Sequence, residues 1–308
     1  MSDKSAELVD PSCSTSAELG RKAFIGLSVA AAAGGAILPA LSAELELGKP
    51  HRPFVAEDDP AITVERPVLP LWEGHLDAYA AYAAHGSAFA PGIVVVQHIW
   101  GVDAQIRDTV RRLAKQGYVV VAPDLYSGLG APSGDGATDH KPFVDFAQKL
   151  SPQIVDRDVV AAAAWIRKRD NADPNQRPPK IGIMGFCMGG ALALRAATDT
   201  DVFDALVVFY GDVRRGEGDK STPISDAELS YTDRIRIPFM GQFGARDTSI
   251  AAADVRAMQH RLHGANDIKI YDEAGHAFFD DTRERYVASA ASDAWQRTLT
   301  WFGKYLKA

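Results

Sequence analysis

The chain has 308 residues, of which 46% are hydrophobic and 24% are charged, so it is long and apolar enough to bury one large core. Lys and Arg number 33 against 40 Asp and Glu, which gives a net charge of -7. This acidic balance excludes the basic surface with which a nucleic-acid-binding protein neutralises phosphates. A small-molecule partner is expected instead.

The first 43 residues have the pattern of an export signal. A polar start is followed by Arg21-Lys22 and then by an Ala/Gly-rich apolar stretch that reaches Leu41. This order is similar to a twin-arginine signal, although Lys22 stands where that motif has its second arginine. The alternative is an uncleaved membrane anchor, since the stretch approaches the roughly 18 to 20 apolar residues of a membrane span. We expect residues 1–43 to engage the export machinery and to be cleaved, leaving a periplasmic or otherwise exported protein without stable membrane association.

The two cysteines have different expected fates. Cys13 lies within the signal and is lost with it, which leaves Cys187 alone in the mature chain. A disulfide within that chain is then impossible. A single thiol in an oxidising compartment is either buried and inert or retained for chemistry.

Strand and helix patterns alternate through most of the chain. Residues 44–60, rich in proline and charge, are expected to be an extended linker, and residues 61–308 the catalytic domain. The alternation predicts an α/β fold with a mostly parallel sheet and helices on both faces. Two long loops, 127–141 and 211–236, follow strands at the sheet edge where such folds bind ligands. In chain order the predicted elements are strand 92–97, helix 103–116, strand 118–122, helix 143–169, strand 180–185, helix 188–197, strand 205–210, strand 237–243, helix 251–263, strand 268–271 and helix 283–305.

Segment 185–190, with the sequence GFCMGG, stands between a predicted strand and a predicted helix, as a nucleophile elbow does. Glycines on both sides of Cys187 allow the strained turn that projects the sulfur into a cleft. The free N–H groups at the start of the following helix favour a thiolate. The alternative is a buried structural cysteine beside a glycine-rich packing turn.

An acid and a histidine follow Cys187 in the order that this kind of site requires. Asp247 comes after the predicted strand 237–243, and His276 comes after the predicted strand 268–271. The alternative roles are a helix cap for Asp247 and a solvated loop position for His276. The other histidines show no metal-ligand spacing, so we expect neither a metal nor an organic cofactor.

Several blocks of residues carry a resemblance to a known family, and they are 97–102 (QHIWGV), 117–118 (GY), 122–126 (APDLY), 185–190 (GFCMGG), 210–211 (YG), 274–278 (AGHAF) and 294–295 (AW). In this order they resemble the dienelactone hydrolase family, the cysteine branch of the α/β-hydrolases, over most of residues 61–308. The resemblance implies an α/β-hydrolase fold with Cys187, Asp247 and His276 as the catalytic residues.

The resemblance also implies roles for residues around the nucleophile. The backbone N–H groups of Ile99 and Met188 would form the oxyanion hole. Trp100, Tyr126 and Tyr210 would line the substrate pocket, although aromatic residues beside strands are more often plain core.

The sequence departs from the family pattern at two places. His98 stands where the family has a glutamate after the third strand, and an imidazolium there would favour the thiolate of Cys187. The alternative is that His98 points away from the thiol. Asp280 stands where the family has an arginine that grips the substrate carboxylate, and the candidate replacements are Arg283 and Arg285, expected on the last helix.

The sequence therefore predicts a hydrolase that cleaves a small ester or lactone through a Cys-His-Asp triad and an acyl-enzyme. One alternative is a thioester or peptide hydrolase that uses the same three residues. Another is a non-catalytic binding or redox-sensing relative, which would need neither the aspartate nor the histidine. The loops that set specificity carry no readable code for the substrate.

Overall fold

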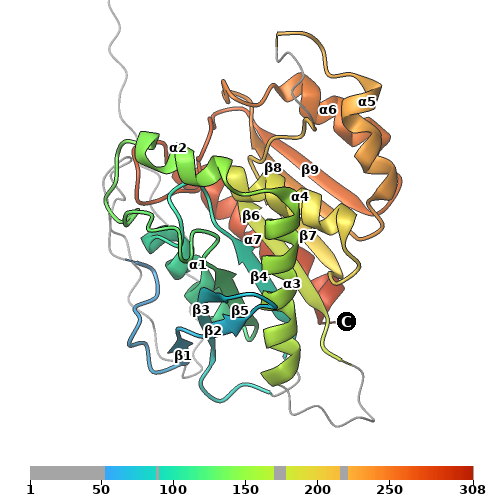
Figure 1. Cartoon of the computed structure of the whole chain (residues 1–308). Coiled ribbons are helices and arrows are strands. Elements are labelled where there is room, and N and C mark those ends of the chain that lie inside the picture. Colours follow the sequence, from blue (N-terminus) through green and yellow to red (C-terminus); the bar gives the residue numbers. More distant parts are fainter. Residues whose placement is uncertain (1–52, 88–89, 170–177, 216–220, 308) are drawn as a thin grey trace, which may run out of the picture. The chain divides into compact units, whose positions relative to one another are not determined.

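The computed structural model describes residues 53–87, 90–169, 178–215 and 221–307, so the expected export signal lies outside the described residues. The strands of this part of the chain form a 9-stranded sheet in the order β1-β3-β5-β4-β6-β7-β8-β9, with β2 paired to β3 (Figure 1). The strands are β1 (Ile62–Glu65), β2 (Val68–Pro70), β3 (His75–Ala83), β4 (Gly92–Val96), β5 (Val119–Pro123), β6 (Ile181–Phe186), β7 (Ala205–Phe209), β8 (Phe239–Gly244) and β9 (Asn266–Tyr271).

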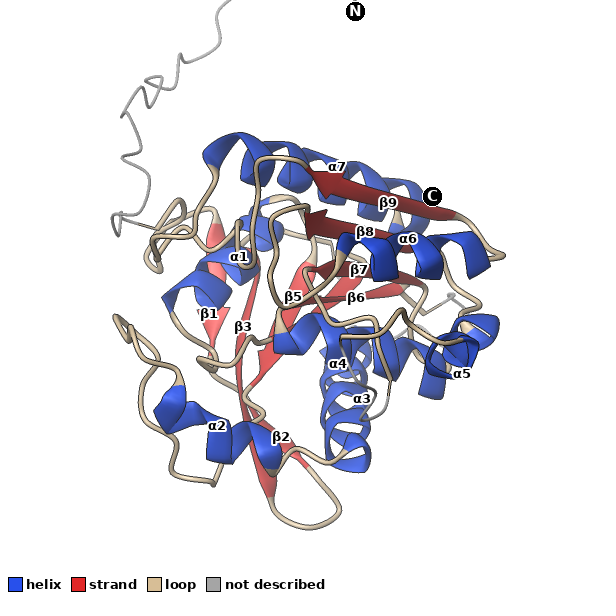
Figure 2. Cartoon of the chain, turned by 90° about the horizontal axis from the view of Figure 1, so that it is seen from above, coloured by secondary structure: helices blue, strands red, loops and turns tan. Residues whose placement is uncertain are grey.

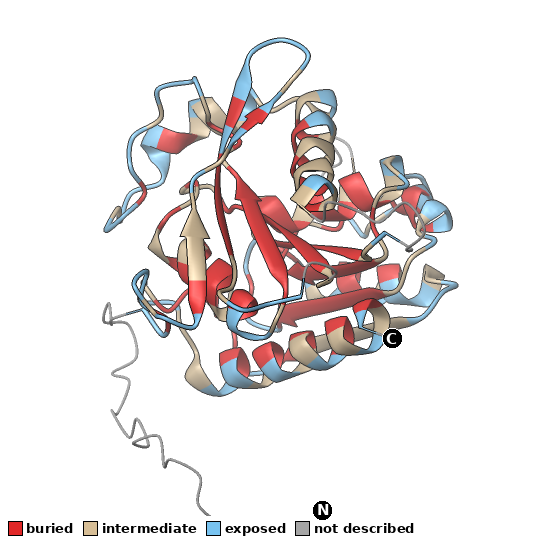
Figure 3. Cartoon of the chain, turned by 90° about the horizontal axis from the view of Figure 1, so that it is seen from below, coloured by how far each residue is buried: buried red, intermediate tan, exposed pale blue. Residues whose placement is uncertain are grey.

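The sheet is parallel from β5 to β9, and β3 pairs in antiparallel fashion with β1, β2 and β5. Strands β4 to β8 are buried along their whole length (Figure 3). This matches their runs of apolar residues, because a parallel sheet in such a fold is covered on both faces. The predicted fold class is confirmed.

Helices cover both faces of the sheet (Figure 2). On one face, α1 lies near α7, since the Arg112 guanidinium is 4.0 Å from the ring centroid of Trp295. On the other face, α3 packs beside α4. Among the described residues no helix is both long and apolar enough to cross a bilayer. The helices are α1 (Ala104–Lys115), α2 (Lys141–Gln148), α3 (Pro152–Arg169), α4 (Met188–Asp199), α5 (Asp226–Leu229), the 3-10 helix η1 (Ser230–Arg234), α6 (Ala252–Arg261) and α7 (Ala288–Leu306).

Two helix predictions were wrong, one because the helix is interrupted and one because it begins later. The single helix expected over 143–169 is two helices, α2 and α3, because Pro152 starts α3. Proline has no N–H to donate and is tolerated only in the first turn, and Ser151 Oγ accepts the Ile154 N–H at 3.3 Å beside it. The last helix begins at Ala288 rather than 283. The residues before it form turns instead.

The described part of the expected linker, from Pro53 onward, contacts the domain. The backbone N–H of Val55 donates to Asp108 Oδ1 on α1 at 2.9 Å. The Phe54 ring lies 4.7 Å from the Arg112 guanidinium of the same helix. This segment is therefore fixed to α1 through Asp108 and Arg112.

Candidate active site

Cys187 lies in the turn between β6 and α4, with φ 53° and ψ -119°. These angles are unfavourable for a residue with a Cβ and are held here by close backbone packing on both sides. A Cβ on Gly185 would collide with the carbonyl of Gly189, and a Cβ on Gly189 would collide with the carbonyl of Gln97. The strand-turn-helix arrangement that the glycine spacing predicts is present, and it directs the Cys187 side chain away from the sheet.

A continuous line of hydrogen bonds joins Cys187, His276 and Asp247. His276 Nε2 is 2.9 Å from Cys187 Sγ, and His276 Nδ1 donates to Asp247 Oδ2 at 2.8 Å. The other carboxylate oxygen, Oδ1, accepts the backbone N–H groups of Ser249 at 2.7 Å and Ile250 at 3.1 Å. Both oxygens are thus occupied, which fixes the carboxylate and through it the imidazole ring.

Helix α6 does not use Asp247 as its cap. The N-cap residue of α6 is Ala251, and no side chain caps that end. The Asp247 side chain is only 1% exposed and the His276 side chain 16% exposed, so the pair lies largely out of water. Hydrogen bonds are electrostatically stronger in such surroundings than at a wet surface.

The pKa of His276 is strongly shifted. Burial on its own would lower this pKa, but the hydrogen bonds to Asp247 and Cys187 raise it to about 10. The ring therefore carries its second proton at neutral pH. A protonated imidazole beside the sulfur is placed to hand a proton to a leaving group.

The two expected oxyanion donors are the backbone N–H groups of Ile99, which follows β4, and of Met188, the first residue of α4. Within the described residues neither N–H donates to a protein acceptor, as an oxyanion hole requires. The Tyr126 hydroxyl holds the two loops together, because it donates to the Ile99 carbonyl at 3.0 Å and lies 3.8 Å from Met188 Sδ. Tyr126 therefore contacts both residues that carry the expected donors.

Aromatic side chains from α2 and from two loops lie beside the site. The Trp100 ring meets Phe143 of α2 edge-on at 5.4 Å between centroids, and the Tyr126 ring lies 6.0 Å from that of Phe146. Trp100 and Tyr126 had been expected in the pocket, whereas sequence reasoning missed the two phenylalanines. Their apolar spacing within a short helix was the available signal.

Tyr210 and Ala277 share the backbone strain of Cys187. They have φ values of 37° and 62°, and these three are the positive-φ residues other than glycine in the described parts of the chain. The Tyr210 ring packs edge-on against His276 at 5.4 Å between centroids, and Ala277 directly follows that histidine. Strained backbone gathers at functional sites, because the surrounding structure must hold it in place.

His98 bonds to a carboxylate rather than to the thiol. Its Nε2 lies 2.9 Å from Asp103 Oδ1, and the residue is buried. Arg283 Nη1 donates to the other oxygen of Asp103 at 3.0 Å and to Asp280 Oδ2 at 2.7 Å. Arg285 is exposed, and neither arginine lies on the last helix. Sequence reasoning missed Asp103, although a polar residue just before a predicted helix signals an N-cap, and Asp103 is one.

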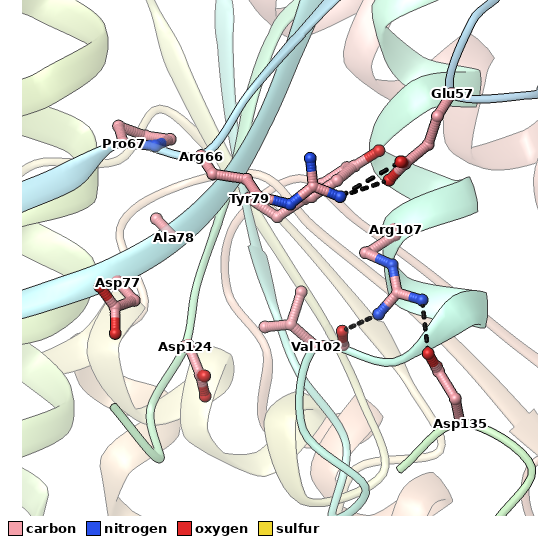
Figure 4. Close-up of a pocket in the computed structure, with 10 residues that line it drawn as sticks. All are labelled: Glu57, Arg66, Pro67, Asp77, Ala78, Tyr79, Val102, Arg107, Asp124 and Asp135. Atoms are coloured by element: carbon pink, nitrogen blue, oxygen red, sulfur yellow. Dashed lines mark hydrogen bonds and ion pairs between the residues drawn. The ribbon is translucent and has the colours of Figure 1, made fainter. Parts of the chain in front are cut away.

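A separate cavity of about 490 Å³ is lined by residues of β3, of α1 and of the segments around them (Figure 4). We name it the outer cavity; its lining residues are Glu57, Arg66, Pro67, Asp77, Ala78, Tyr79, Val102, Arg107, Asp124 and Asp135. Both arginines are paired, Arg66 with Glu57 at 2.9 Å and Arg107 with Asp135 at 2.8 Å. None of the three hydrogen-bonded residues Cys187, His276 and Asp247 lines it.

In residues 53–87, 90–169, 178–215 and 221–307, no cluster of three or more His, Cys, Asp or Glu side chains has an arrangement that could hold a metal ion.

Comparison with known proteins gives one consistent result. The sequence model of the dienelactone hydrolase family matches residues 76–306. Proteins named "Putative carboxymethylenebutenolidase" are 34% identical in Yersinia pestis, over 77% of this chain and 86% of that protein, and 33% identical in Escherichia coli K12, over 82% and 91%. A crystal structure of a "Putative Dienelactone Hydrolase" from Klebsiella pneumoniae has a TM-score of 0.67 and 31% identity, covering 80% of this chain and 100% of that one.

Proposed function

Because the chain belongs to the dienelactone hydrolase family, we propose that it hydrolyses a small ester or lactone through Cys187, His276 and Asp247. The observation that supports this assignment is the pair of hydrogen bonds, 2.9 Å and 2.8 Å long, that joins sulfur, imidazole and carboxylate. A nucleophile, a base and an orienting group in one line are the arrangement of covalent acyl transfer. The carboxymethylenebutenolidase name of the relatives agrees with an ester or lactone as the substrate.

Acylation begins when the Cys187 thiolate attacks the carbonyl carbon. The carbonyl oxygen becomes an oxyanion and accepts hydrogen bonds from the N–H groups of Ile99 and Met188. As the bond between carbon and the alcohol oxygen breaks, the His276 imidazolium gives its proton to that oxygen. The products of this half are a thioester on Cys187 and a neutral His276; from a lactone, the alcohol stays attached to the acyl group.

Deacylation uses the same groups in reverse roles. Neutral His276 takes a proton from a water molecule, whose oxygen attacks the thioester carbonyl. The second oxyanion occupies the same N–H groups, and its collapse expels the Cys187 thiolate. Asp247 stabilises the imidazolium that forms in this step and keeps the ring in one orientation. The acid leaves, and the thiolate-imidazolium pair is restored.

The direct test compares wild-type protein with Cys187→Ala on a panel of neutral esters, lactones and thioesters. Loss of the nucleophile lowers kcat/KM at least about a thousandfold. Quenched reactions of the wild type should show the acyl group on the peptide that contains Cys187 by mass spectrometry. Turnover by Cys187→Ala above about a thousandth of the wild-type rate contradicts the proposal. Turnover of thioesters alone would assign a thioester hydrolase.

We also propose that residues 1–43 are a cleaved export signal. Support comes from the sequence, where Arg21-Lys22 precedes an Ala/Gly-rich apolar stretch. Fractionation of the native host should then find a mature protein that starts near Glu44 outside the cytoplasm. Replacing Arg21 and Lys22 together by glutamine should retain the precursor inside the cell. Full-length wild-type protein in the cytosol would refute the assignment.

A further inference from the structure

Two carboxylates hold the Arg283 guanidinium beside the site. Its Nη1 donates to Asp103 Oδ2 at 3.0 Å and to Asp280 Oδ2 at 2.7 Å, and its Nη2 donates to the Gly134 carbonyl at 3.2 Å. The guanidinium carbon also lies 4.3 Å from the centroid of the Trp100 ring. Both terminal nitrogens and the face of this arginine are therefore in contact with the protein, whereas its buried Nε has no hydrogen-bond partner among the described residues. Its charge is opposed by two charges of the other sign.

The charges of this cluster leave a negative excess. His98 is the other basic group in contact with Asp103, and it shares that carboxylate with Arg283. Asp280 is 4% exposed, and its second oxygen, Oδ1, accepts the N–H and the hydroxyl of Thr282. With a neutral His98, two carboxylates face one guanidinium in a region with little water to screen them.

The two carboxylates belong to the loops that carry the site residues. Asp280 lies four residues after His276, and its backbone N–H donates to the Ala277 carbonyl at 3.0 Å; Asp103 lies five residues after His98, which precedes Ile99. The Tyr210 ring packs against His276 at 5.4 Å between centroids, and the charges of Asp280 and Cys187 add to the rise that burial causes in the pKa of Tyr210. The triad adds to this excess, since one imidazolium stands between two acidic groups.

The remaining walls are apolar. Trp100 and Tyr126, backed by Phe143 and Phe146 of α2, offer aromatic ring surfaces. Lys149 lies over the outer ring, with Nζ 5.1 Å from the centroid of Phe146. Aromatic walls bind uncharged groups by removing apolar surface from water, whereas burying an unpaired carboxylate among them is costly.

From this arrangement we propose that the Cys187 site accepts esters or lactones that are uncharged around the reacting carbonyl and disfavours those that carry a carboxylate there, with Asp280 as a specificity-determining residue. The inference rests on the proposed hydrolysis for its substrate class. The electrostatic part concerns the thiol itself and is testable without turnover.

Alkylation of Cys187 by iodoacetamide and by iodoacetate provides that test, because the two reagents differ mainly in charge. The ratio of the iodoacetate rate to the iodoacetamide rate is measured at Cys187 by peptide mass spectrometry, in folded protein and in protein unfolded by urea. We expect the ratio to be about tenfold lower in the folded protein, and salt to raise it. A folded ratio equal to or above the unfolded ratio overturns the proposal.

Asp280→Asn assigns the effect to its residue. This variant should raise the folded ratio several-fold towards the unfolded value, and Asp280→Glu should keep the wild-type ratio. The matched control is Asp201→Asn, which removes the same charge. Asp201 is exposed and lies before the amino end of β7, whereas the site residues follow the carboxyl ends of their strands. Equal ratios for Asp280→Asn and Asp201→Asn overturn the role of Asp280. If Asp280→Asn does not fold, the ratio and salt dependence of the wild type still decide the charge preference of the site, and Asp280→Glu and Asp280→Ser decide the role of Asp280.

Hydrolysis of 4-nitrophenyl benzoate and 4-nitrophenyl 4-carboxybenzoate extends the test to substrates, with each kcat/KM divided by the rate constant for hydroxide. The neutral ester should be preferred about tenfold. Equal use of both esters overturns the substrate class and leaves the proposed hydrolase intact. The two proposals can also fail separately. If the ratio of the iodoacetate rate to the iodoacetamide rate is low but the protein turns over none of the esters, lactones and thioesters of the wider panel, the proposed function is contradicted instead.

Discussion

The Cys187 site and the outer cavity both contain paired charges, but they differ in how those charges are surrounded. At the Cys187 site, the side chains of His276 and Asp247 are 16% and 1% exposed. In the outer cavity, the side chains of Arg66 and Glu57 are 63% and 46% exposed. Strained backbone occurs at Cys187, with φ 53°, and at no described non-glycine residue that lines the outer cavity.

This difference shows why volume alone does not locate chemistry. An ion pair in contact with water gains little, because solvent screens both charges. A buried line of hydrogen bonds keeps its direction and its strength, so it can move a proton to a defined atom. Changes at the Cys187 site should therefore alter catalysis strongly, whereas changes in the outer cavity should not.

The largest effect is expected from Asp247→Asn. This change removes the charge that stabilises the imidazolium and should lower kcat/KM by roughly 10² to 10⁴. It should also shift the alkaline limb of the pH profile to lower pH, since the hydrogen bond to Asp247 helps to hold the pKa of His276 at about 10. Profiles of kcat/KM against pH for both proteins test this. Alkaline limbs at the same pH would show that Asp247 does not set that pKa.

The same raised pKa has a signed effect on stability. The folded value of about 10 lies above the reference value of 6.5, so the folded state holds the extra proton more tightly. The stabilisation is fully present below about pH 6.5 and is lost as pH rises through about 10. Urea unfolding of wild type and of Asp247→Asn can be measured at several pH values from about 6.5 to about 10. The difference between their free energies of unfolding should shrink as pH rises. A constant difference would contradict this linkage.

A smaller effect on stability, with a matched control, is expected from two glycine substitutions. A Cβ at Gly189 would meet the carbonyls of Val96 and Gln97, so Gly189→Ala should lower the free energy of unfolding by about 1–3 kcal/mol and reduce activity by displacing the elbow. Gly303 lies in α7 with open space around its Cβ position, so Gly303→Ala should raise stability by up to about 1 kcal/mol. Urea unfolding measures both, and a harmless Gly189→Ala would show that the elbow has room.

Local sequence patterns are sufficient to predict much of the site. The glycines around Cys187 and the order of Asp247 and His276 after their strands identify the three residues that the structure brings together. The parallel sheet follows from apolar runs alternating with helical spacing, because each pattern concerns neighbours in the chain. These predictions needed no knowledge of distant contacts.

Contacts between distant residues could not be predicted in this way. Arg283 pairs with Asp103, 180 residues earlier in the chain, and no local pattern links two such positions. The partner of His98 is only five residues away, and it was missed because the direction of a side chain depends on packing rather than on sequence spacing. Pro152 is different, because its sequence signal was present and the helix boundary before it was overlooked.

A moderate effect is expected from Tyr126→Phe. The lost hydroxyl donates to the Ile99 carbonyl at 3.0 Å and helps to position both expected oxyanion donors. One hydrogen bond of this kind corresponds to roughly 0.5–1.5 kcal/mol, so kcat/KM should fall by about 2- to 10-fold. The matched control is Tyr231→Phe, which removes a buried tyrosine bond to the Val213 carbonyl at 2.8 Å and should cost stability without changing kcat. Equal activities of the two variants would remove the positioning role of Tyr126.

The smallest effect is expected from Arg66→Gln in the outer cavity. Arg66 is mostly in solvent, and Glu57 keeps a second cation, Arg111, at 3.7 Å after the substitution. The free energy of unfolding should fall by less than about 1 kcal/mol, and a double-mutant cycle with Glu57→Gln isolates the pair from other contacts of either residue. Added salt should weaken the coupling further, because exposed charges are screened. The substrates for this comparison are those whose turnover requires Cys187, as the inactivity of Cys187→Ala shows. On each of them, kcat/KM of Arg66→Gln should stay within about twofold of wild type. A tenfold change would mean that the outer cavity binds part of the substrate, since so exposed a pair has no other means of reaching the thiol.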